Sequence, residues 1–206
     1  LAVRAKTSET RARLDLFGPW RVQVDLTGAV AAAWATADFD AGGWPTVRLP
    51  RAFDDCAPGM ERFLGTCWFR RTFRVPRAWR GRRVVLRFEG VSYNAAVWLN
   101  GRSVGGRTDA FLPFELDVGD ALLPGRANVV AVRVDNVRSP SQLPPFEGWL
   151  GQGGILREVG LLAGDYLRLE DVLLAAAPEP GGGRLEIGLA IVNDRPADAT
   201  AEATVA

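Results

Sequence analysis

The sequence contains no histidine and only two cysteines in 206 residues. Without histidine, these residues cannot form a Ser-His or Cys-His catalytic pair, a histidine metal site or a histidine pH switch. Cys56 and Cys67 are too few for a disulfide framework or a tetrahedral zinc site, and the sequence leaves open whether they pair. We therefore expect neither a metal site nor a cofactor.

Excess charge and long apolar runs are also missing. Lys and Arg number 25 against 24 Asp and Glu, so no net field favours nucleic acid or an anionic membrane. The alanine-rich run 28–37 is interrupted by Trp34 and is far shorter than the roughly 20 residues that span a bilayer. The start has neither Met nor a signal pattern, so we expect an internal or processed fragment. Cytoplasmic, secreted and periplasmic locations all stay open.

The most informative stretch is 84–134, where short runs of alternating apolar and polar residues follow one another. Asn100-Gly101 separates two extended runs, and this dipeptide favours a tight hairpin because both residues tolerate positive φ. The runs 111–118 and 128–135 are separated by a turn that contains Pro124 and Gly125. The spacing leaves no room for a helix, so the stretch predicts an antiparallel β block.

Six sequence words along the chain resemble a known family. They are FEGV, VWLNG, PFELDV and LPGRANVVAVRVDN within 88–136, WFRRTF at 68–73, and GGILREV at 153–159. In this order and spacing they resemble the N-terminal sugar-binding domain of glycoside hydrolase family 2, which includes β-galactosidases, β-glucuronidases and β-mannosidases. The resemblance implies an all-β fold over residues 16–164, a jelly-roll-like sandwich of about eight or nine strands in two sheets.

The ends of the chain are expected to differ from this domain. Residues 1–15 are polar and basic with little periodicity, and we interpret them as a leader. Extended runs at 166–174, 185–193 and 199–205 predict the first strands of a second β domain. The resemblance implies an immunoglobulin-like sandwich, which needs about seven strands and 100 residues. Residues 165–206 are therefore expected to be only part of it.

The catalytic machinery of the family is not expected in these residues. A retaining glycosidase uses two carboxyl groups about 5 Å apart. The resemblance implies that both lie on a (β/α)₈ barrel after the two sandwiches, with the acid/base in an Asn-Glu dipeptide. This chain contains no Asn-Glu and no alternating strand and helix pattern, so no catalytic residue is assigned. The implied partners are that barrel and a β-glycoside.

The best candidate site is the segment 138–154. Its three prolines cannot lie in a central strand, and long loops of this kind are usually functional. Phe146, Glu147, Trp149 and Gln152 supply the aromatic faces and hydrogen-bonding groups that recognise sugars. In the resembling family an acidic residue before the GGI word reaches over the barrel mouth to the terminal sugar, and Glu147 is the nearest match. The alternative for Glu147 is a solvated loop carboxylate.

Asp54 and Asp55 are further candidates, because they follow an expected strand directly and the resembling loop lies near the catalytic pocket. Their alternative role is turn capping. Phe88, Trp98 and Phe114 occur in alternating strands and are expected in the core, rather than in a sugar platform.

Three functions are compatible with the sequence. The first is the N-terminal part of a family 2 glycosidase, in which the sandwich braces the barrel and lends a loop to substrate recognition. The second is a free-standing carbohydrate-binding module, and the third is a structural domain at an oligomer interface. An incomplete second domain favours the first. The sugar itself cannot be read, because several glycosidases of different specificity share this domain.

Overall fold

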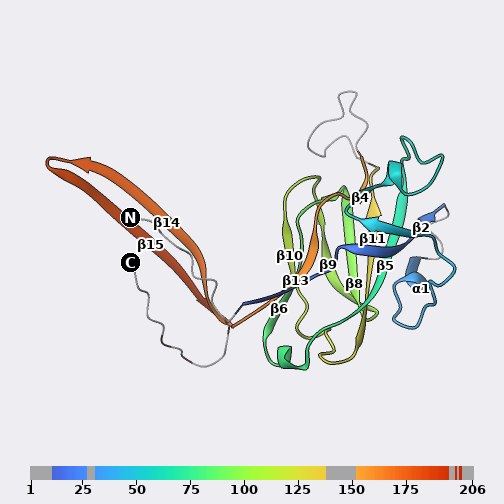
Figure 1. Ribbon diagram of the computed structural model, residues 1–206, viewed down its shortest axis with the longest axis horizontal. Helices are drawn as coiled ribbons and strands as arrows, with labels where there is room; N and C mark the ends of the chain where they lie inside the picture. Colours follow the sequence, from blue (N-terminus) through green and yellow to red (C-terminus); the bar gives the residue numbers. More distant parts are fainter. Residues whose placement is uncertain (1–10, 27–30, 138–151, 195–197, 199, 201–206) are drawn as a thin grey trace. The chain divides into compact units, whose positions relative to one another are not determined.

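The computed structural model describes residues 11–26, 31–137, 152–194, 198 and 200. The chain divides into two compact units: one comprises Arg13–Ala163, and the other combines Leu1–Ala12 with Gly164–Ala206. Strands dominate both units, which confirms the all-β prediction (Figure 1). One short helix, α1 (Ala31–Trp34), is described, and no described helix is long and apolar enough to cross a membrane.

The first unit is a sandwich of two main sheets (Figure 1). The larger has the order β3-β2-β5-β11-β8-β9 and the smaller has the order β1-β13-β6-β10. The larger sheet contains β2 (Gly18–Asp25), β3 (Thr46–Leu49), β5 (Thr66–Arg74), β8 (Asn94–Leu99), β9 (Arg102–Thr108) and β11 (Ala127–Asp135). The smaller contains β1 (Ala12–Asp15), β6 (Arg83–Phe88), β10 (Phe114–Asp117) and β13 (Val159–Gly164).

A short third sheet closes one end of the unit. It consists of β4 (Arg51–Ala52), β12 (Gly154–Ile155) and β7 (Val91–Ser92), in the order β4-β12-β7. Two 3-10 turns complete the described elements of the first unit: η1 (Phe53–Asp55) and η2 (Arg77–Trp79).

The first strand begins earlier than the expected domain boundary at residue 16. In β1, Ala12 and Leu14 are half-buried while Arg13 and Asp15 are exposed. This is the two-residue alternation of a strand with one face against the core. The alternation is only four residues long, so it could not be recognised within the polar and basic residues 1–15.

The core lies between the two main sheets. Its largest fully buried side chains include Trp20, Phe69, Phe88 and Leu161. Phe88 and Phe114 stack with their ring centroids 5.0 Å apart, and both are buried, as the sequence predicts. Such ring pairs add about 0.5–1.5 kcal/mol to the stabilisation from burial alone.

A second aromatic cluster covers part of the outer face of the larger sheet. Trp68 and Trp98 stack there with centroids 5.1 Å apart, and Trp34, Phe39 and Trp44 pack beside them. Trp98 is therefore only half-buried, and it belongs to this outer cluster rather than to the core between the sheets. The segment 31–44 brings most of these rings to the sheet.

The hairpin at Asn100-Gly101 is confirmed. Both residues have positive φ, 53° and 83°, and they join β8 to β9. The Asn100 side chain accepts a hydrogen bond from Val129 N at 2.8 Å and donates one to Asn128 Oδ1 at 2.9 Å. The turn is thereby attached to the start of β11 as well as to its own strands.

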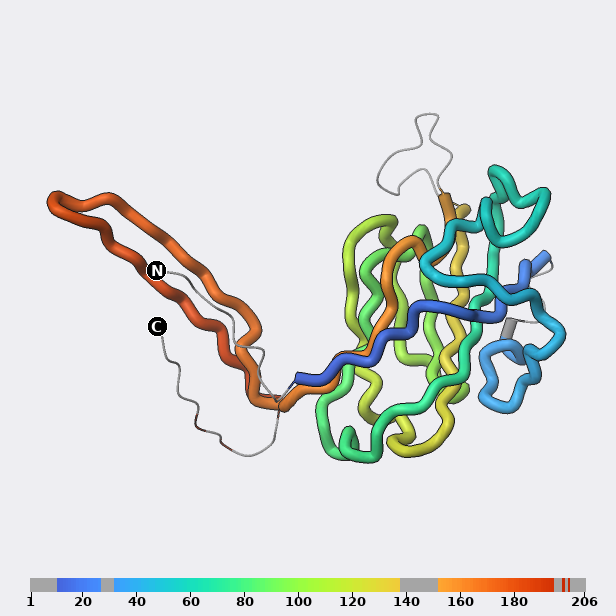
Figure 2. The backbone as a smooth tube through the Cα atoms, viewed as in Figure 1, coloured from blue at the N-terminus to red at the C-terminus, as the bar shows by residue number. Residues whose placement is uncertain are grey.

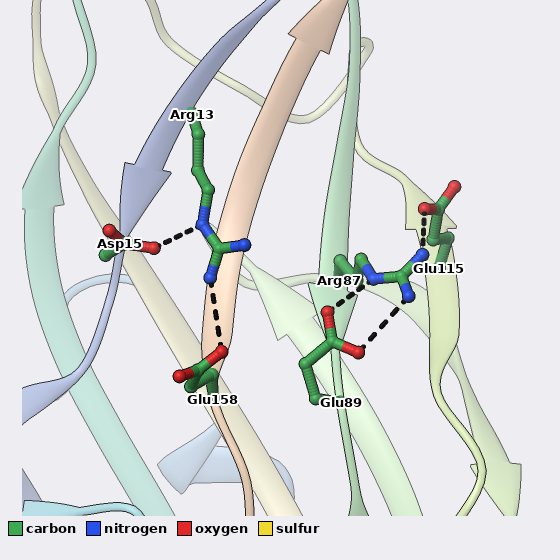
Figure 3. Close-up of polar contacts among 6 residues, drawn as sticks. All are labelled: Arg13, Asp15, Arg87, Glu89, Glu115 and Glu158. Carbon is green, nitrogen blue, oxygen red and sulfur yellow. Dashed lines mark hydrogen bonds and ion pairs between the residues drawn. The ribbon is translucent and has the colours of Figure 1, made fainter. Parts of the chain in front are cut away.

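The outer face of the smaller sheet carries ion pairs between neighbouring strands (Figure 3). Arg87 on β6 lies 2.6 Å from a Glu89 oxygen and 2.9 Å from a Glu115 oxygen, while Arg13 contacts Glu158 at 3.5 Å. Hydrogen bonds from Arg87 lower the pKa of Glu89. Alternating charges of this kind keep the face soluble and favour one strand register.

The second unit contains a long hairpin of β14 (Leu167–Glu179) and β15 (Gly182–Asn193). Val172 pairs with Leu189 and Leu174 pairs with Ile187, so these four side chains share one face. Most large apolar side chains of both strands are exposed in this unit. The first strand extends further than the sequence predicts, and the expected strand at 199–205 lies outside the described residues apart from position 200.

Candidate functional site

The short sheet β4-β12-β7 contains Gly154, which is the last residue of the candidate segment 138–154. Gly154 on β12 pairs with Ala52 on one side and with Ser92 on the other. Figure 2 shows the chain of residues 51–55 beside that of residues 152–155. Phe146, Glu147 and Trp149 lie outside the described residues, so the structure describes the attachment of their segment and not their positions.

Gly153 is attached directly to the turn that contains two of the candidate carboxylates. Phe53 N donates a hydrogen bond to Gly153 O at 2.8 Å. A Cβ added to Gly153 would lie 2.4 Å from the Phe53 ring and 2.7 Å from Asn136 Cβ. Only glycine fits at this position, because neither the buried ring nor the buried Asn136 has room to move away.

The next residue is also restricted to glycine. Gly154 has a φ of +130°, and a Cβ there would lie 2.5 Å from Arg51 O. The following residue, Ile155, is fully buried. The GGI word is therefore explained by close backbone packing of β12 against β4, a reason that is independent of any ligand.

Asn136, which lies shortly before the candidate segment, attaches the chain there to a distant part of the domain. Its side chain accepts a hydrogen bond from Gly65 N at 2.8 Å and donates one to Phe63 O at 2.8 Å. It is 2% exposed. These bonds join the end of β11 to the segment 60–65. Asn136 and Gly153 thus flank the undescribed segment 138–151 and lie against each other.

Asp54 and Asp55 lie in η1, next to this attachment. Asp54 is half-buried and Asp55 is exposed, while Arg51 Nη1 donates to Asp55 O at 2.8 Å. Gln152 is exposed and directly precedes Gly153. The fold therefore brings Gln152 and the two carboxylates to one end of the sandwich.

The two cysteines are free thiols in the structure. Burial raises the pKa of Cys56 to about 11, against the opposing effect of the Arg51 charge. Burial also raises the pKa of Cys67. At neutral pH both are protonated, so neither is an activated nucleophile. Within the described residues there is also no group of three or more carboxylate or thiol side chains that could hold a metal.

Sequence reasoning missed Phe53 and Asn136 as the residues that fix this end. The available signal was the pair Gly153-Gly154 before an apolar residue, since adjacent glycines in an extended segment indicate close approach of another backbone or ring. The described groups at this end offer amide and carboxylate hydrogen bonding, which suits recognition of hydroxyl groups.

Comparison with known proteins gives a family and a set of relatives. The model of the glycosyl hydrolases family 2, sugar binding domain, matches residues 8–164. A β-glucuronidase of Paenibacillus borealis is 33% identical over 144 residues, covering 68% of this chain and 24% of the relative. A β-galactosidase of Thermoanaerobacter pseudethanolicus is 34% identical over 143 residues, covering 66% and 19%. The chain spans about a quarter or less of the length of these curated relatives.

Solved structures have the same fold. A β-glucuronidase of Lactobacillus rhamnosus superposes with a TM-score of 0.83 over 93% of this chain and 35% of that chain, at 24% identity. A β-glucuronidase of an uncultured Clostridium gives 0.81 over 92% of this chain and 35% of that chain, also at 24% identity. At this identity the likeness concerns the fold. With the family match over residues 8–164, it leads to one conclusion: the chain belongs to glycosyl hydrolase family 2 and contains its sugar-binding domain.

Proposed function

We propose that this chain is the N-terminal, non-catalytic part of a glycosidase that hydrolyses O-glycosyl bonds. The family match over residues 8–164 carries the proposal. The relatives named above are a β-glucuronidase and a β-galactosidase, and the chain covers 24% and 19% of their lengths. The sandwich would brace the catalytic barrel of the same polypeptide and bind a β-glycoside together with it.

The chemistry is assigned to the barrel rather than to the sandwich. The chain has no Asn-Glu dipeptide. The described elements are strands with short helical turns, without the repeated strand and helix units of a barrel. We propose a retaining mechanism with both carboxyl groups on the barrel.

The role in sugar recognition is assigned to the segment that contains Phe146, Glu147 and Trp149, together with Gln152 and the η1 carboxylates Asp54 and Asp55. Two observations support it. The segment is attached at both of its ends, by Asn136 and by Gly153, and a fixed attachment reduces the entropy lost when a loop binds. Gln152 is exposed next to that attachment.

The second unit is proposed to be the start of an immunoglobulin-like sandwich. The apolar face of the β14–β15 hairpin supports this, because Leu174 and Leu189 are exposed at 59% and 38%. A two-stranded sheet with such a face is marginally stable alone and becomes stable when a second layer covers it. We assign that covering layer to further strands of the same domain.

The test is hydrolysis by the full-length protein on a panel of nitrophenyl β-glycosides, beside the 206-residue chain alone. We expect turnover of at least one glycoside by the full-length protein and none by the 206-residue chain. Absence of turnover on the whole panel, with retained binding of sugars, would instead favour a carbohydrate-binding module. Turnover by the 206-residue chain would contradict the assignment of catalysis to the barrel.

A further inference from the structure

One end of the larger sheet is level across the neighbouring strands β2, β5, β11, β8 and β9 (Figure 1). The residues that pair along this row are Asp25 with Thr66, Thr66 with Asp135, Asp135 with Asn94, and Asn94 with Thr108. β2, β11 and β9 end at this row, whereas β5 and β8 begin there. The segments that adjoin these strands therefore emerge side by side from one end of the sandwich.

Most of the exposed large apolar side chains that the structure describes in the first unit lie just beyond this row. They are Leu26, Leu64, Phe111, Leu112 and Val137, which are 52–85% exposed. The remaining described ones, Phe17 and Leu123, precede the starts of β2 and β11 and so lie at the opposite end. Scattered exposed apolar residues are ordinary, but apolar residues gathered in one place mark a contact with another protein surface. We refer to these five residues as the apolar end.

The Phe111-Leu112 turn of the apolar end is held in place by Asp109. Asp109 Oδ1 accepts hydrogen bonds from Phe111 N at 2.9 Å and from Leu112 N at 3.0 Å. Asp109 N in turn donates to Tyr93 O at 3.1 Å, and Ala110 is 3% exposed. The backbone of the turn is thus fixed to the sheet while both apolar side chains stay exposed. A preorganised surface of this kind loses little entropy when it binds a partner.

The same end carries the groups assigned above to sugar recognition. Gly153 lies against Asn136, which directly follows Asp135 of the row, and Phe53 N of η1 is bonded to Gly153 O. If Gln152 and the η1 carboxylates act on a glycoside held by the barrel, the barrel has to lie against this end. The chain covers 24% of the length of the Paenibacillus borealis relative, so most of such a polypeptide lies outside these residues.

We propose that the apolar end, and the Phe111-Leu112 turn in particular, is the surface on which the catalytic barrel of the same polypeptide docks. The inference rests on the proposed function and adds to it the surface through which the sandwich braces the barrel. The centres of protein interfaces are apolar and rich in aromatic side chains. Phe111 and Leu112 fit the centre of such a contact.

Photo-crosslinking of the full-length protein tests this contact. p-Benzoylphenylalanine replaces Phe111 in one variant and Phe17 in a matched control, because these two side chains are almost equally exposed, at 52% and 53%. After irradiation, mass spectrometry of the digested protein locates the peptide that is joined to each position. Unfolding temperatures close to that of the unchanged protein verify that both variants fold.

We expect the Phe111 variant to crosslink to residues beyond 206 of the same polypeptide, and the Phe17 variant to give no such product. A crosslink from Phe111 to a second copy, recognised by a doubled mass on a denaturing gel, would overturn the proposal. Crosslinks confined to residues 1–206, or equal yields from both positions, would overturn it as well.

Thiol labelling gives a second measurement on the full-length protein. In Leu112→Cys the introduced thiol should react with iodoacetamide at least about tenfold more slowly than in Leu123→Cys, because a covered thiol reacts only when the contact opens. Leu123 is the control, since it is 44% exposed at the opposite end of the sheet. Equal labelling rates would contradict the docking surface.

Neither measurement depends on turnover, so the two proposals fail separately. A protein that gives the expected crosslink but hydrolyses no glycoside would keep the docking surface and lose the proposed activity. A protein that hydrolyses a glycoside without the crosslink would keep the activity and lose the docking surface.

Discussion

Gly153 lies against the ring of Phe53, and a Cβ at Gly153 would lie 2.4 Å from two of the ring atoms. Phe53 is fully buried, so the ring cannot move into solvent. We expect Gly153→Ala to lower the free energy of unfolding by about 2–3 kcal/mol, the usual cost of overpacking a core. Urea denaturation monitored by tryptophan fluorescence measures the change.

Gly43→Ala is the matched control for this prediction, because a Cβ at Gly43 meets no atom within 4 Å. We expect its free energy of unfolding to stay within about 0.5 kcal/mol of the original. In the double variant Gly153→Ala/Phe53→Leu, part of the loss should be recovered, since the smaller side chain makes room. Equal stability of Gly153→Ala and Gly43→Ala would show that Gly153 is not sterically restricted.

The structure also explains which parts of the fold the sequence could predict. The hairpin at Asn100-Gly101 depends on local backbone preferences, and the sequence predicted it correctly. The close approach of Gly153 to Phe53 joins residues a hundred positions apart, so the Gly153-Gly154 pair can indicate a close approach but not which residue makes it. The same holds for Asn136, whose partners Gly65 and Phe63 lie in a distant segment.

The sequence predicted where strands occur better than it predicted which of their side chains point to the core. The sequence indicated that Trp98 points to the core, whereas Val97 and Leu99 are the fully buried residues of β8. Both faces of this strand are apolar, so alternation alone could not decide between them. The outer face is apolar because the segment 31–44 packs against part of that sheet, and a covering segment cannot be inferred from the strand itself.

Arg70 anchors that covering segment and gives a second prediction. Its three hydrogen bonds go to carbonyl oxygens of residues 34–39. Arg70→Lys keeps the charge but cannot reproduce the planar donor geometry, so we expect a loss of about 1–3 kcal/mol and faster hydrogen exchange in residues 34–42. Arg74→Lys, an exposed position on the same strand, serves as the control. Unchanged exchange in both variants would contradict the anchoring role.

The ion pairs of Arg87 predict a pH dependence of stability. Hydrogen bonds from Arg87 lower the pKa of Glu89 in the folded protein below its ordinary value of 4.5. The contribution is therefore present above pH 4.5 and is lost as pH falls through the folded pKa. Glu89→Gln should reduce stability by about 0.5 kcal/mol at neutral pH and flatten its decline in acid. Urea titrations at several pH values measure this, and parallel curves for both proteins would contradict it.

The thiols predict slow labelling. With a pKa of about 11, Cys56 has a thiolate fraction at pH 8 of about one in a thousand. We expect iodoacetamide to modify Cys56 slowly, with a rate that rises about tenfold per pH unit up to pH 11, and to leave the fully buried Cys67 unmodified while the protein is folded. Mass spectrometry of the labelled peptides follows both sites. Labelling at the rate of an unstructured peptide would contradict the burial of these residues.

The hairpin of the second unit gives a paired prediction that tests the proposed second sandwich. Leu173 and Leu174 are adjacent and exposed at 71% and 59%, but they point to opposite faces. If further strands cover the apolar face, Leu174→Asp should lower the unfolding temperature of the full-length protein by several degrees, while Leu173→Asp should have little effect. Differential scanning calorimetry distinguishes them. Equal effects would contradict a single covered face.

The central claim is that the sandwich belongs to a glycosidase and lends Glu147 to its substrate, and kcat/KM of full-length Glu147→Gln measures it most directly. Loss of a charged hydrogen bond to the sugar costs about 1.5–3 kcal/mol, so we expect kcat/KM to fall about 10- to 150-fold on the glycoside that the unchanged protein hydrolyses. Glu158→Gln is the matched control, since its side chain is 61% exposed on the outer face of the smaller sheet. We expect the control to retain full activity. Equal kcat/KM for both variants and the unchanged protein would contradict the role of Glu147, and absence of hydrolysis by the unchanged protein would contradict the glycosidase assignment itself.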